Sequence, residues 1–422
     1  MIKELIKKEL KGAIESTLGP EFLDFDLTHP QNDTFGDFTL SVALKASKVL
    51  KQSPLMIAEK LSRQIQSKNR IFEKVEVAPP GFLNLTVKNE YLIEEIKMIA
   101  ERGDAYGRGD TLADKKFMVE FAHPNTHKEV HVGHLRNLSL GESLVRLQEA
   151  LSATVIRANY QGDVGLHVAK ALWGIINSSK LKDLLQRRIR LGRKSAKLED
   201  EPLLERVKFL GQCYVEGNKA YEGEEKGEVI EINKKIYAND PEIMEIWKKT
   251  RAWSLEYFDH IYALLGSRFD RFYFESEVSQ PGTIIAKEAL ISGILTESEG
   301  AVIFDGTPYG LDKRVFLNSQ GLPTYEAKEL GLASIEFSQF GEIDKCIHVV
   351  GPEQQSFFKV TFKVEELLDP KKYTGKQYHF AYGYVQLKEG KMSSRKGNII
   401  TALSVIERAK EGIKKLIKSG SL

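Results

Sequence analysis

Two histidines three residues apart are the first candidates for chemistry in this sequence. His131-Val132-Gly133-His134 stands where a strand-like segment ends and helical spacing begins. The first turn of a helix presents free backbone N–H groups and a partial positive charge, which attract phosphate. The two imidazoles fall on one side of that turn, and Gly133 lets a planar ligand lie close to the backbone. The pattern suits attack on the α-phosphate of a nucleotide, but two polar histidines near a helix start would look the same.

A basic loop near the end of the chain is the second candidate. It has the sequence Lys391-Met392-Ser393-Ser394-Arg395-Lys396-Gly397-Asn398. Its cations and hydroxyls suit the β- and γ-phosphates of the same nucleotide, and a mobile loop can follow the departing pyrophosphate. Taken alone, a solvated surface loop explains it better. The two motifs together, in this order, are far more specific than either alone.

The elements around the histidines predict an α/β fold. Residues 117–121 form a short apolar strand, residues 135–151 have a helical apolar face, and residues 154–160 form a second strand. A strand, a helix and a strand in this order indicate a parallel sheet with a right-handed crossover. Further strands are predicted at 271–274, 301–304, 314–317, 346–350 and 382–387, with a helix at 324–335.

Three regions surround this core. Residues 1–108 predict a small α+β domain, with helices at 2–17 and 40–65 (broken near Pro54) and strands at 75–77 and 82–87. Residues 109–398 form the predicted Rossmann-type domain, with a helical insertion at about 176–265. The insertion carries a basic stretch, 180–197, which either is a solvated face or binds RNA. Residues 399–422 predict one amphipathic helix, the start of a truncated helical region.

Composition sets limits on the class of protein. The 422 residues hold 61 Lys and Arg against 59 Asp and Glu, so any nucleic-acid surface must come from local clustering. No apolar run approaches the roughly 18 residues of a membrane span, and the charged N-terminus lacks a secretory signal. Two cysteines exclude a disulfide framework and a multi-cysteine zinc site. We therefore expect a cytoplasmic protein without membrane contact.

The two motifs resemble the signatures of class I aminoacyl-tRNA synthetases. Further stretches are similar to the arginyl-tRNA synthetase family; they are Val119–His134, Asn159–Gly165, Glu275–Glu277, Pro323–Leu330 and Val349–Gln354. Gly36-Asp37 and Pro80–Asn84 resemble that family's N-terminal domain, which contacts the tRNA elbow. The resemblance implies a ligase that activates L-arginine with ATP and transfers it to tRNA(Arg).

A cationic substrate agrees with the residue types in these stretches. Guanidinium recognition needs carboxylates, often beside an aromatic ring. Tyr325 and Glu329 are four residues apart on a predicted helix, and Glu275 offers a second carboxylate at a strand end. The family usually has aspartate at the position of Glu329. By resemblance, Glu120 and Asn125 hold the α-amino and carboxylate groups of arginine, and Gln354 lines the pocket.

The remaining site residues follow from the resemblance. The ATP site is expected to comprise His131, Gly133, His134, Gly162, Asp163, Met392, Ser393 and Ser394. Lys391 and Lys396 supply catalytic cations with the two histidines. Ser394 replaces the family's usual second lysine, and Lys128, just before the histidine motif, is expected to take over its charge. Mg²⁺ is expected to arrive on ATP rather than in a protein metal site.

Two other functions remain open. Only about two dozen residues follow the basic loop, where the family has a helical anticodon-binding domain, so we expect a fragment of a longer protein. A non-catalytic tRNA-binding paralogue is one alternative, although both motifs are intact. Another class I synthetase is the second, but Glu275 and Glu329 make an acidic pocket that disfavours the glutamyl and glutaminyl enzymes. We expect a monomer.

Overall fold

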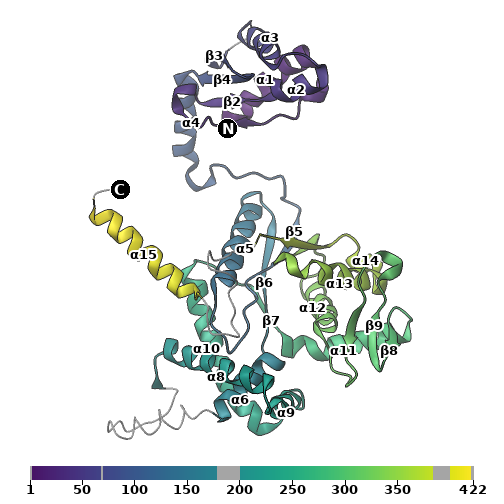
Figure 1. Cartoon of the computed structure of the whole chain (residues 1–422). Coiled ribbons are helices and arrows are strands. Elements are labelled where there is room, and N and C mark those ends of the chain that lie inside the picture. The colour runs from purple at the N-terminus through teal and green to yellow at the C-terminus, as the bar shows by residue number, and fades with distance from the viewer. Residues whose placement is uncertain (1, 68–69, 178–199, 384–399, 420–422) are drawn as a thin grey trace. The chain divides into compact units, whose positions relative to one another are not determined.

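The computed structural model describes residues 2–67, 70–177, 200–383 and 400–419, and the chain divides into two compact units. The N-terminal unit comprises Met1–Arg108 and the C-terminal unit Gly109–Leu422 (Figure 1). Their boundary falls in the Gly- and Asp-rich stretch that separates the two predicted domains in the sequence. Each unit has its own buried apolar cluster, so each is described by itself.

The N-terminal unit is an antiparallel sheet packed against helices. The strand order is β1-β2-β4-β3, with β1 at Leu27–Thr28, β2 at Phe38–Leu40, β3 at Phe72–Ala78 and β4 at Phe82–Val87. The helices are α1 (Ile2–Leu18), α2 (Val42–Leu50), α3 (Pro54–Ser67) and α4 (Asn89–Arg102). Ile6, Leu10 and Ile14 are buried, as their helical spacing requires. The predicted break of the helical run 40–65 near Pro54 is confirmed: the run forms two helices, and Pro54 is the first residue of α3.

The C-terminal unit is built on five parallel strands. Their order is β12-β11-β5-β6-β7, with β5 at Lys116–Glu120, β6 at Thr154–Gln161, β7 at Arg271–Phe274, β11 at Lys345–Val350 and β12 at Gln377–Ala381. From β5 the sheet grows through β6 and β7 on one side and through β11 and β12 on the other. In such sheets a ligand binds beyond the carboxyl ends of the strands where the order reverses. Here that point lies between β5 and β11.

Helices cover both faces of this sheet. They are α5 (Val132–Ala150), α11 (Glu275–Ile291), α12 (Tyr325–Gln339), α13 (Gln355–Leu368) and α14 (Pro370–Tyr373). Successive residues of β5 point to opposite faces, so Val119 packs with Leu138 of α5 while Met118 packs with Leu332 of α12. A small antiparallel sheet of order β10-β9-β8 adjoins α11 and α12; its strands are β8 (Thr296–Ser298), β9 (Ala301–Phe304) and β10 (Arg314–Leu317).

The predicted strand at 382–387 is wrong at Tyr382 and Gly383 and untested at its other residues. The edge strand β12 lies five residues earlier, and residues 382 and 383 are irregular. The apolar residues at 382–387 suggested a buried strand, whereas Gln377–Ala381 alternates polar and apolar side chains as a half-buried edge strand does. Residues 384–387 lie outside the described residues.

In the part of the insertion that the structure describes, four helices lie between β6 and β7. They are α6 (Leu166–Asn177), α8 (Leu203–Glu222), α9 (Lys226–Tyr237) and α10 (Pro241–Leu264), which gather at the foot of Figure 1. Two glycines let α6 and α8 touch: a Cβ on Gly217 would lie 1.8 Å from the Lys170 carbonyl oxygen, and one on Gly174 would lie 2.1 Å from that of Cys213. The basic stretch 180–197 lies outside the described residues.

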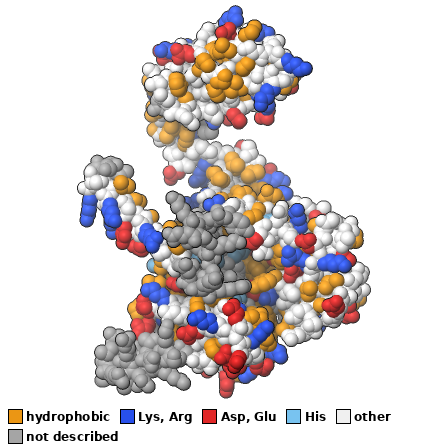
Figure 2. Space-filling view, viewed as in Figure 1, with side chains coloured by type: hydrophobic (Ala, Val, Ile, Leu, Met, Phe, Trp, Pro, Cys, Tyr) orange, Lys and Arg blue, Asp and Glu red, His pale blue; other side chains and the backbone are white. Residues whose placement is uncertain are grey.

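The surface and the last helix complete the unit. On the face seen in Figure 2, acidic and basic side chains lie interspersed over the described helices of the insertion. The final helix, α15 (Ala402–Lys418), begins beside α5, where the Ala402 N–H donates to the Val130 carbonyl at 2.8 Å. None of the helices in the described ranges has the length and apolarity needed to cross a membrane.

Candidate active site

The two histidines of the first motif cap helix α5 reciprocally. The backbone N–H of His131 donates to Nδ1 of His134 at 3.2 Å, and that of Gly133 donates to Nδ1 of His131 at 3.1 Å. The ring centroids lie 3.8 Å apart, and the ring planes are tilted by 30°. Burial, followed by the charges of neighbouring groups including Lys128, lowers the pKa of both imidazoles, so they are neutral. A neutral imidazole whose Nδ1 accepts carries its hydrogen on Nε2, so each ring offers one donor suited to a phosphate oxygen.

Gly133 is required by this arrangement. A Cβ at this position would lie 2.8 Å from Cε1 and 2.9 Å from Nδ1 of the His131 ring. Any other residue would displace that imidazole and break the cap. The glycine between the histidines therefore permits their close contact, whether or not a ligand also approaches it.

Both flanks of the basic loop are attached to α5 beside the histidines. The Val132 N–H donates to the Ile400 carbonyl at 3.0 Å, and His131 forms an isolated β-bridge with Thr401. On the other flank, Nδ2 of Asn137 donates to the Tyr382 hydroxyl at 3.0 Å. Lys391, Met392, Ser393, Ser394 and Lys396 themselves lie outside the described residues. The described residues on both sides of the loop thus contact α5, at Asn137 before the loop and at Val132 after it.

Asn137 links the two strands between which the sheet order reverses, β5 and β11. Its Oδ1 accepts from the Ala122 N–H at 2.6 Å, and its Nδ2 donates to the Val349 carbonyl at 2.6 Å. The same side chain thus joins the ends of β5 and β11 to α5. Our sequence reasoning missed this residue, although a polar side chain on the apolar face of the helix, three residues after His134, was a usable signal.

The loop after β5 rests on Gly162. The Thr126 N–H donates to the Gly162 carbonyl at 2.8 Å, and a Cβ on Gly162 would lie 2.1 Å from Oδ1 of Asn125. Asn125 therefore stands directly over a residue that must be glycine. This contact gives Gly162 a defined structural role, while its assignment to ATP stays a prediction.

Asp163 is enclosed by partners from two helices. One carboxylate oxygen accepts from Nε of Arg251 at 2.8 Å and from Oγ of Ser276 at 2.7 Å, and the other accepts from the Ser276 N–H at 2.8 Å. The indole of Trp247 donates to its carbonyl at 2.7 Å. Asp163 thus ties α10 of the insertion to α11. Its contact with ATP also stays a prediction, and Arg251 is a residue that sequence reasoning missed.

The three predicted arginine-binding carboxylates are buried, and each has a different charge environment. Glu120, Glu275 and Glu329 are 2%, 4% and 4% exposed. Glu275 accepts from Nζ of Lys328 at 2.7 Å, and Lys328 is buried as well. Burial opposes the charge of Lys328, but Glu275 outweighs it and raises the lysine pKa. The Glu275–Lys328 pair is therefore neutral, and Glu275 does not present a spare negative charge to a guanidinium.

Glu120 and Glu329 share one histidine. Nδ1 of His348 lies 3.3 Å from Oε1 of Glu120 and 3.8 Å from Oε1 of Glu329. Burial alone would raise both carboxyl pKa values, but His348 overcomes it at Glu120 and lowers that pKa to about 2. At Glu329 burial prevails and raises the pKa to about 8. Oε1 of Glu329 and Oε2 of Glu120 have no hydrogen-bond partner among the described residues, so each of these two groups has an oxygen available to a cation.

The other predicted residues lie nearer the surface. Tyr325 begins α12 and is 61% exposed, although it precedes the buried Glu329 by one turn. Nζ of Lys328 lies 5.4 Å from the centre of its ring. Gln354 is exposed at the end of a short 3-10 helix, Pro352–Gln354, just after β11. Lys128 lies over the Tyr214 ring, with Nζ 4.3 Å from its centre.

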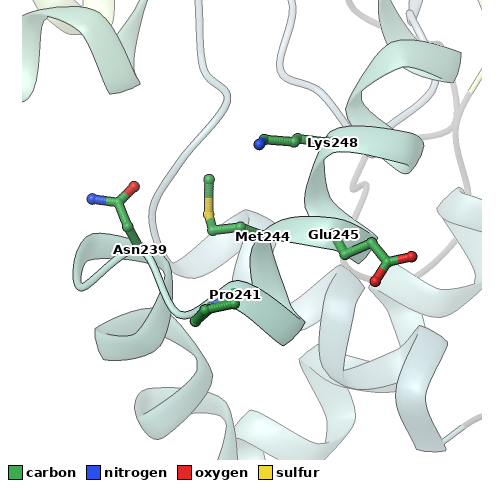
Figure 3. Close-up of a pocket in the computed structure, with 5 residues that line it drawn as sticks. All are labelled: Asn239, Pro241, Met244, Glu245 and Lys248. Atoms are coloured by element: carbon green, nitrogen blue, oxygen red, sulfur yellow. The ribbon is translucent and has the colours of Figure 1, made fainter.

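A separate pocket lies in the insertion and contains none of the predicted site residues. Figure 3 shows it lined by Asn239, Pro241, Met244, Glu245 and Lys248, at the start of α10. Within the described ranges, no group of three or more His, Cys, Asp or Glu side chains is arranged to hold a metal ion. The chemistry-bearing side chains gather instead where β5, β6 and β11 end.

Comparisons with known proteins cover both units. Residues 96–420 match the family model described as "tRNA synthetases class I (R), catalytic domain", and residues 1–87 match "Arginyl tRNA synthetase N terminal domain". The arginine–tRNA ligases of Bdellovibrio bacteriovorus and Borreliella afzelii are 29% and 30% identical. Each match covers 98% of this chain and 70% or 69% of the relative.

Solved structures agree on the fold. Arginyl-tRNA synthetase structures from Plasmodium falciparum and Thermus thermophilus superpose with TM-scores of 0.63 and 0.60 at 21% identity. Each superposition covers 99% of this chain and 70% or 71% of the other. At this identity the likeness supports the arrangement of elements, and the roles of individual residues rest on the geometry above.

Proposed function

Since the chain belongs to the class I arginyl-tRNA synthetase family, we propose that it is a ligase that activates L-arginine with ATP and transfers it to tRNA(Arg). One observation supports our proposal that the reaction takes place beside the start of α5. Both flanks of the basic loop are bonded to α5 within two turns of the two histidines, at the point where the sheet order reverses. The two motifs therefore serve one nucleotide.

Adenylate formation needs little covalent chemistry from the protein. An oxygen of the arginine carboxylate attacks the α-phosphorus of ATP in line, the new P–O bond forms, and the bond to pyrophosphate breaks. Nε2–H of His131 and of His134 donate to α-phosphate oxygens as charge grows there. Lys128, Lys391 and Lys396 offset the charge of the polyphosphate, and Mg²⁺ arrives with ATP. The terminal ribose of tRNA then displaces AMP from the arginyl-adenylate.

Each polar part of the arginine is held by a different side chain. The ionised Glu120 receives the α-ammonium, Asn125 receives the carboxylate, and Glu329 receives the guanidinium at the rim formed by Tyr325 and Gln354. Glu275 acts as a neutral pair with Lys328, so it accepts a guanidinium hydrogen without adding net charge. This division supplies one carboxylate for each positive group of the substrate.

The remaining assignments complete the proposal. The N-terminal unit contacts the tRNA elbow, and the protein acts as a cytoplasmic monomer. Domains extend over 1–108, 109–398 and 399–422, as the sequence predicts. Sedimentation or light scattering, with and without tRNA, tests the state of assembly.

Amino-acid-dependent exchange of pyrophosphate into ATP tests the proposed activity. Each of the twenty amino acids is assayed with and without tRNA(Arg), since the family often requires tRNA before activation. We expect exchange with arginine alone among the amino acids. Exchange with a different amino acid would identify another class I synthetase, and no exchange under any condition while tRNA still binds would identify the non-catalytic paralogue.

A further inference from the structure

His348 lies beside two of the carboxyl groups that we assign to arginine binding, Glu120 and Glu329. It lies within β11, in register with Glu120 of β5, and is fully buried. Its Nδ1 is 3.3 Å from Glu120 and 3.8 Å from Glu329, which comes from α12. The rings of Phe358 and Phe362 pack against it at centroid distances of 5.0 and 5.3 Å. One imidazole thus contacts both groups that face the substrate's charges.

The partners on its other side determine its protonation. Nε2 of His348 lies 2.9 Å from Oε1 of Gln377, and Nε2 of Gln377 donates to Oε2 of Glu365 at 2.7 Å. In this arrangement the amide nitrogen faces an oxygen of Glu365, and the amide oxygen faces the histidine, where it can only accept. His348 therefore donates from Nε2 to Gln377 and from Nδ1 to Glu120. An imidazole that donates from both nitrogens is an imidazolium.

We propose that His348 is a positioning residue that sets the charge of the arginine pocket, holding Glu120 ionised for the α-ammonium and leaving Glu329 to be ionised by the incoming guanidinium. This inference rests on the proposed function. The empty pocket is then close to neutral, with one buried cation opposing one buried anion. Arginine completes it by displacing a proton from Glu329 to solvent.

The groups around His348 are consistent with a cationic histidine. Those that face it are Glu120 of β5, His123 of the following loop, Glu329 and Glu336 of α12, Cys346 of the same strand, Glu365 of α13 and His379 of β12. Burial opposes its charge, whereas Cys346 and Glu120 raise its pKa. Because burial also raises the pKa of the Cys346 thiol and keeps it protonated, Glu120 is the anion that stabilises the imidazolium. Burial raises the pKa values of Glu336 and Glu365, so both carboxyl groups are protonated. They therefore add no negative charge to the surroundings of His348.

His348→Asn tests the role, because asparagine keeps a donor near Nδ1 but carries no charge. In pyrophosphate exchange at pH 7.5 with tRNA present, we expect the KM for arginine to rise at least about tenfold and the KM for ATP to change less than twofold. Without the imidazolium the Glu329 proton is held more tightly, so the pH at which the arginine KM levels off moves upward. Raising the pH to 8.5, where the α-ammonium of arginine stays largely charged, should therefore recover part of the lost affinity, which a packing defect would not allow.

Two further variants keep the test decisive. Gln377→Met on the edge strand removes the acceptor behind His348 without touching the pocket, and we expect it to shift the same pH profile by a smaller amount. His260→Asn is the matched control: it removes an exposed histidine of α10, and both KM values should stay within twofold. Equal rises in both KM values, or an unshifted pH profile in His348→Asn and Gln377→Met, would overturn the inference. Failure of the wild-type chain to exchange with arginine would instead overturn the proposed function.

Discussion

The pH dependence of arginine binding is the most direct consequence of the pocket's charge. Glu329 is buried, lacks a hydrogen-bond partner for Oε1 among the described residues, and has a pKa raised to about 8. In the proposed site the guanidinium binds the ionised form of Glu329, so arginine binding is coupled to loss of that proton. The apparent KM for arginine therefore falls as the pH rises through about 8, because the ionised fraction grows.

The size of this effect follows from simple titration. With a pKa of about 8, roughly one molecule in eleven is ionised at pH 7 and about three in four at pH 8.5, so the arginine KM should fall about eightfold over this range. Pyrophosphate exchange measured at several arginine concentrations at each pH gives the profile, and the KM for ATP provides an internal reference. The range ends at pH 8.5 so that the α-ammonium of free arginine stays largely charged.

Substitutions at Glu329 separate the titration from other causes. Glu329→Gln should flatten the profile and raise the arginine KM by about 10- to 100-fold, the loss expected for a hydrogen bond between charged groups. Glu329→Asp should retain the pH dependence, since it keeps the carboxyl group. Glu288→Gln, at an exposed position on α11, is the matched control and should leave the profile unchanged. An arginine KM in the wild type that is constant from pH 7 to 8.5 would refute the reasoning.

Three other substitutions test the framework around the pocket. His134→Asn should lower kcat about 10²-fold or more with little change in the arginine KM, because it removes a donor that acts mainly as charge develops; a change confined to KM would contradict this. Arg251→Met should lower the free energy of unfolding by about 3 kcal/mol in urea titration, because it leaves the buried Asp163 without its cation. An unchanged midpoint of unfolding would contradict a stabilising role of the Arg251–Asp163 pair. Gly217→Ala should cost about 1–3 kcal/mol in the same assay because its Cβ meets the Lys170 carbonyl, whereas Gly227→Ala, with open space around it, should be neutral or stabilising.

The local pattern of the sequence was sufficient to identify many elements and both motifs. The strands β7, β9 and β10 have the predicted bounds, and β5, β6 and β11 differ by a residue or so at their ends. This success has a physical basis: alternation and apolar runs record which side chains face the core, and they do so within a few residues of chain. The histidine motif was likewise recognisable because its chemistry is contained in one helical turn.

The charge state of the pocket was not contained in any local pattern. His348 meets Glu120 across 228 residues and Lys328 meets Glu275 across 53, so neither pairing was visible before the strands were ordered. The sequence showed three acidic residues suited to a cation. Only the fold shows that Glu275 is paired with Lys328, that Glu120 is ionised and that Glu329 holds a proton. Burial and the distance to an opposite charge decide a carboxyl pKa, and both are properties of the assembled chain.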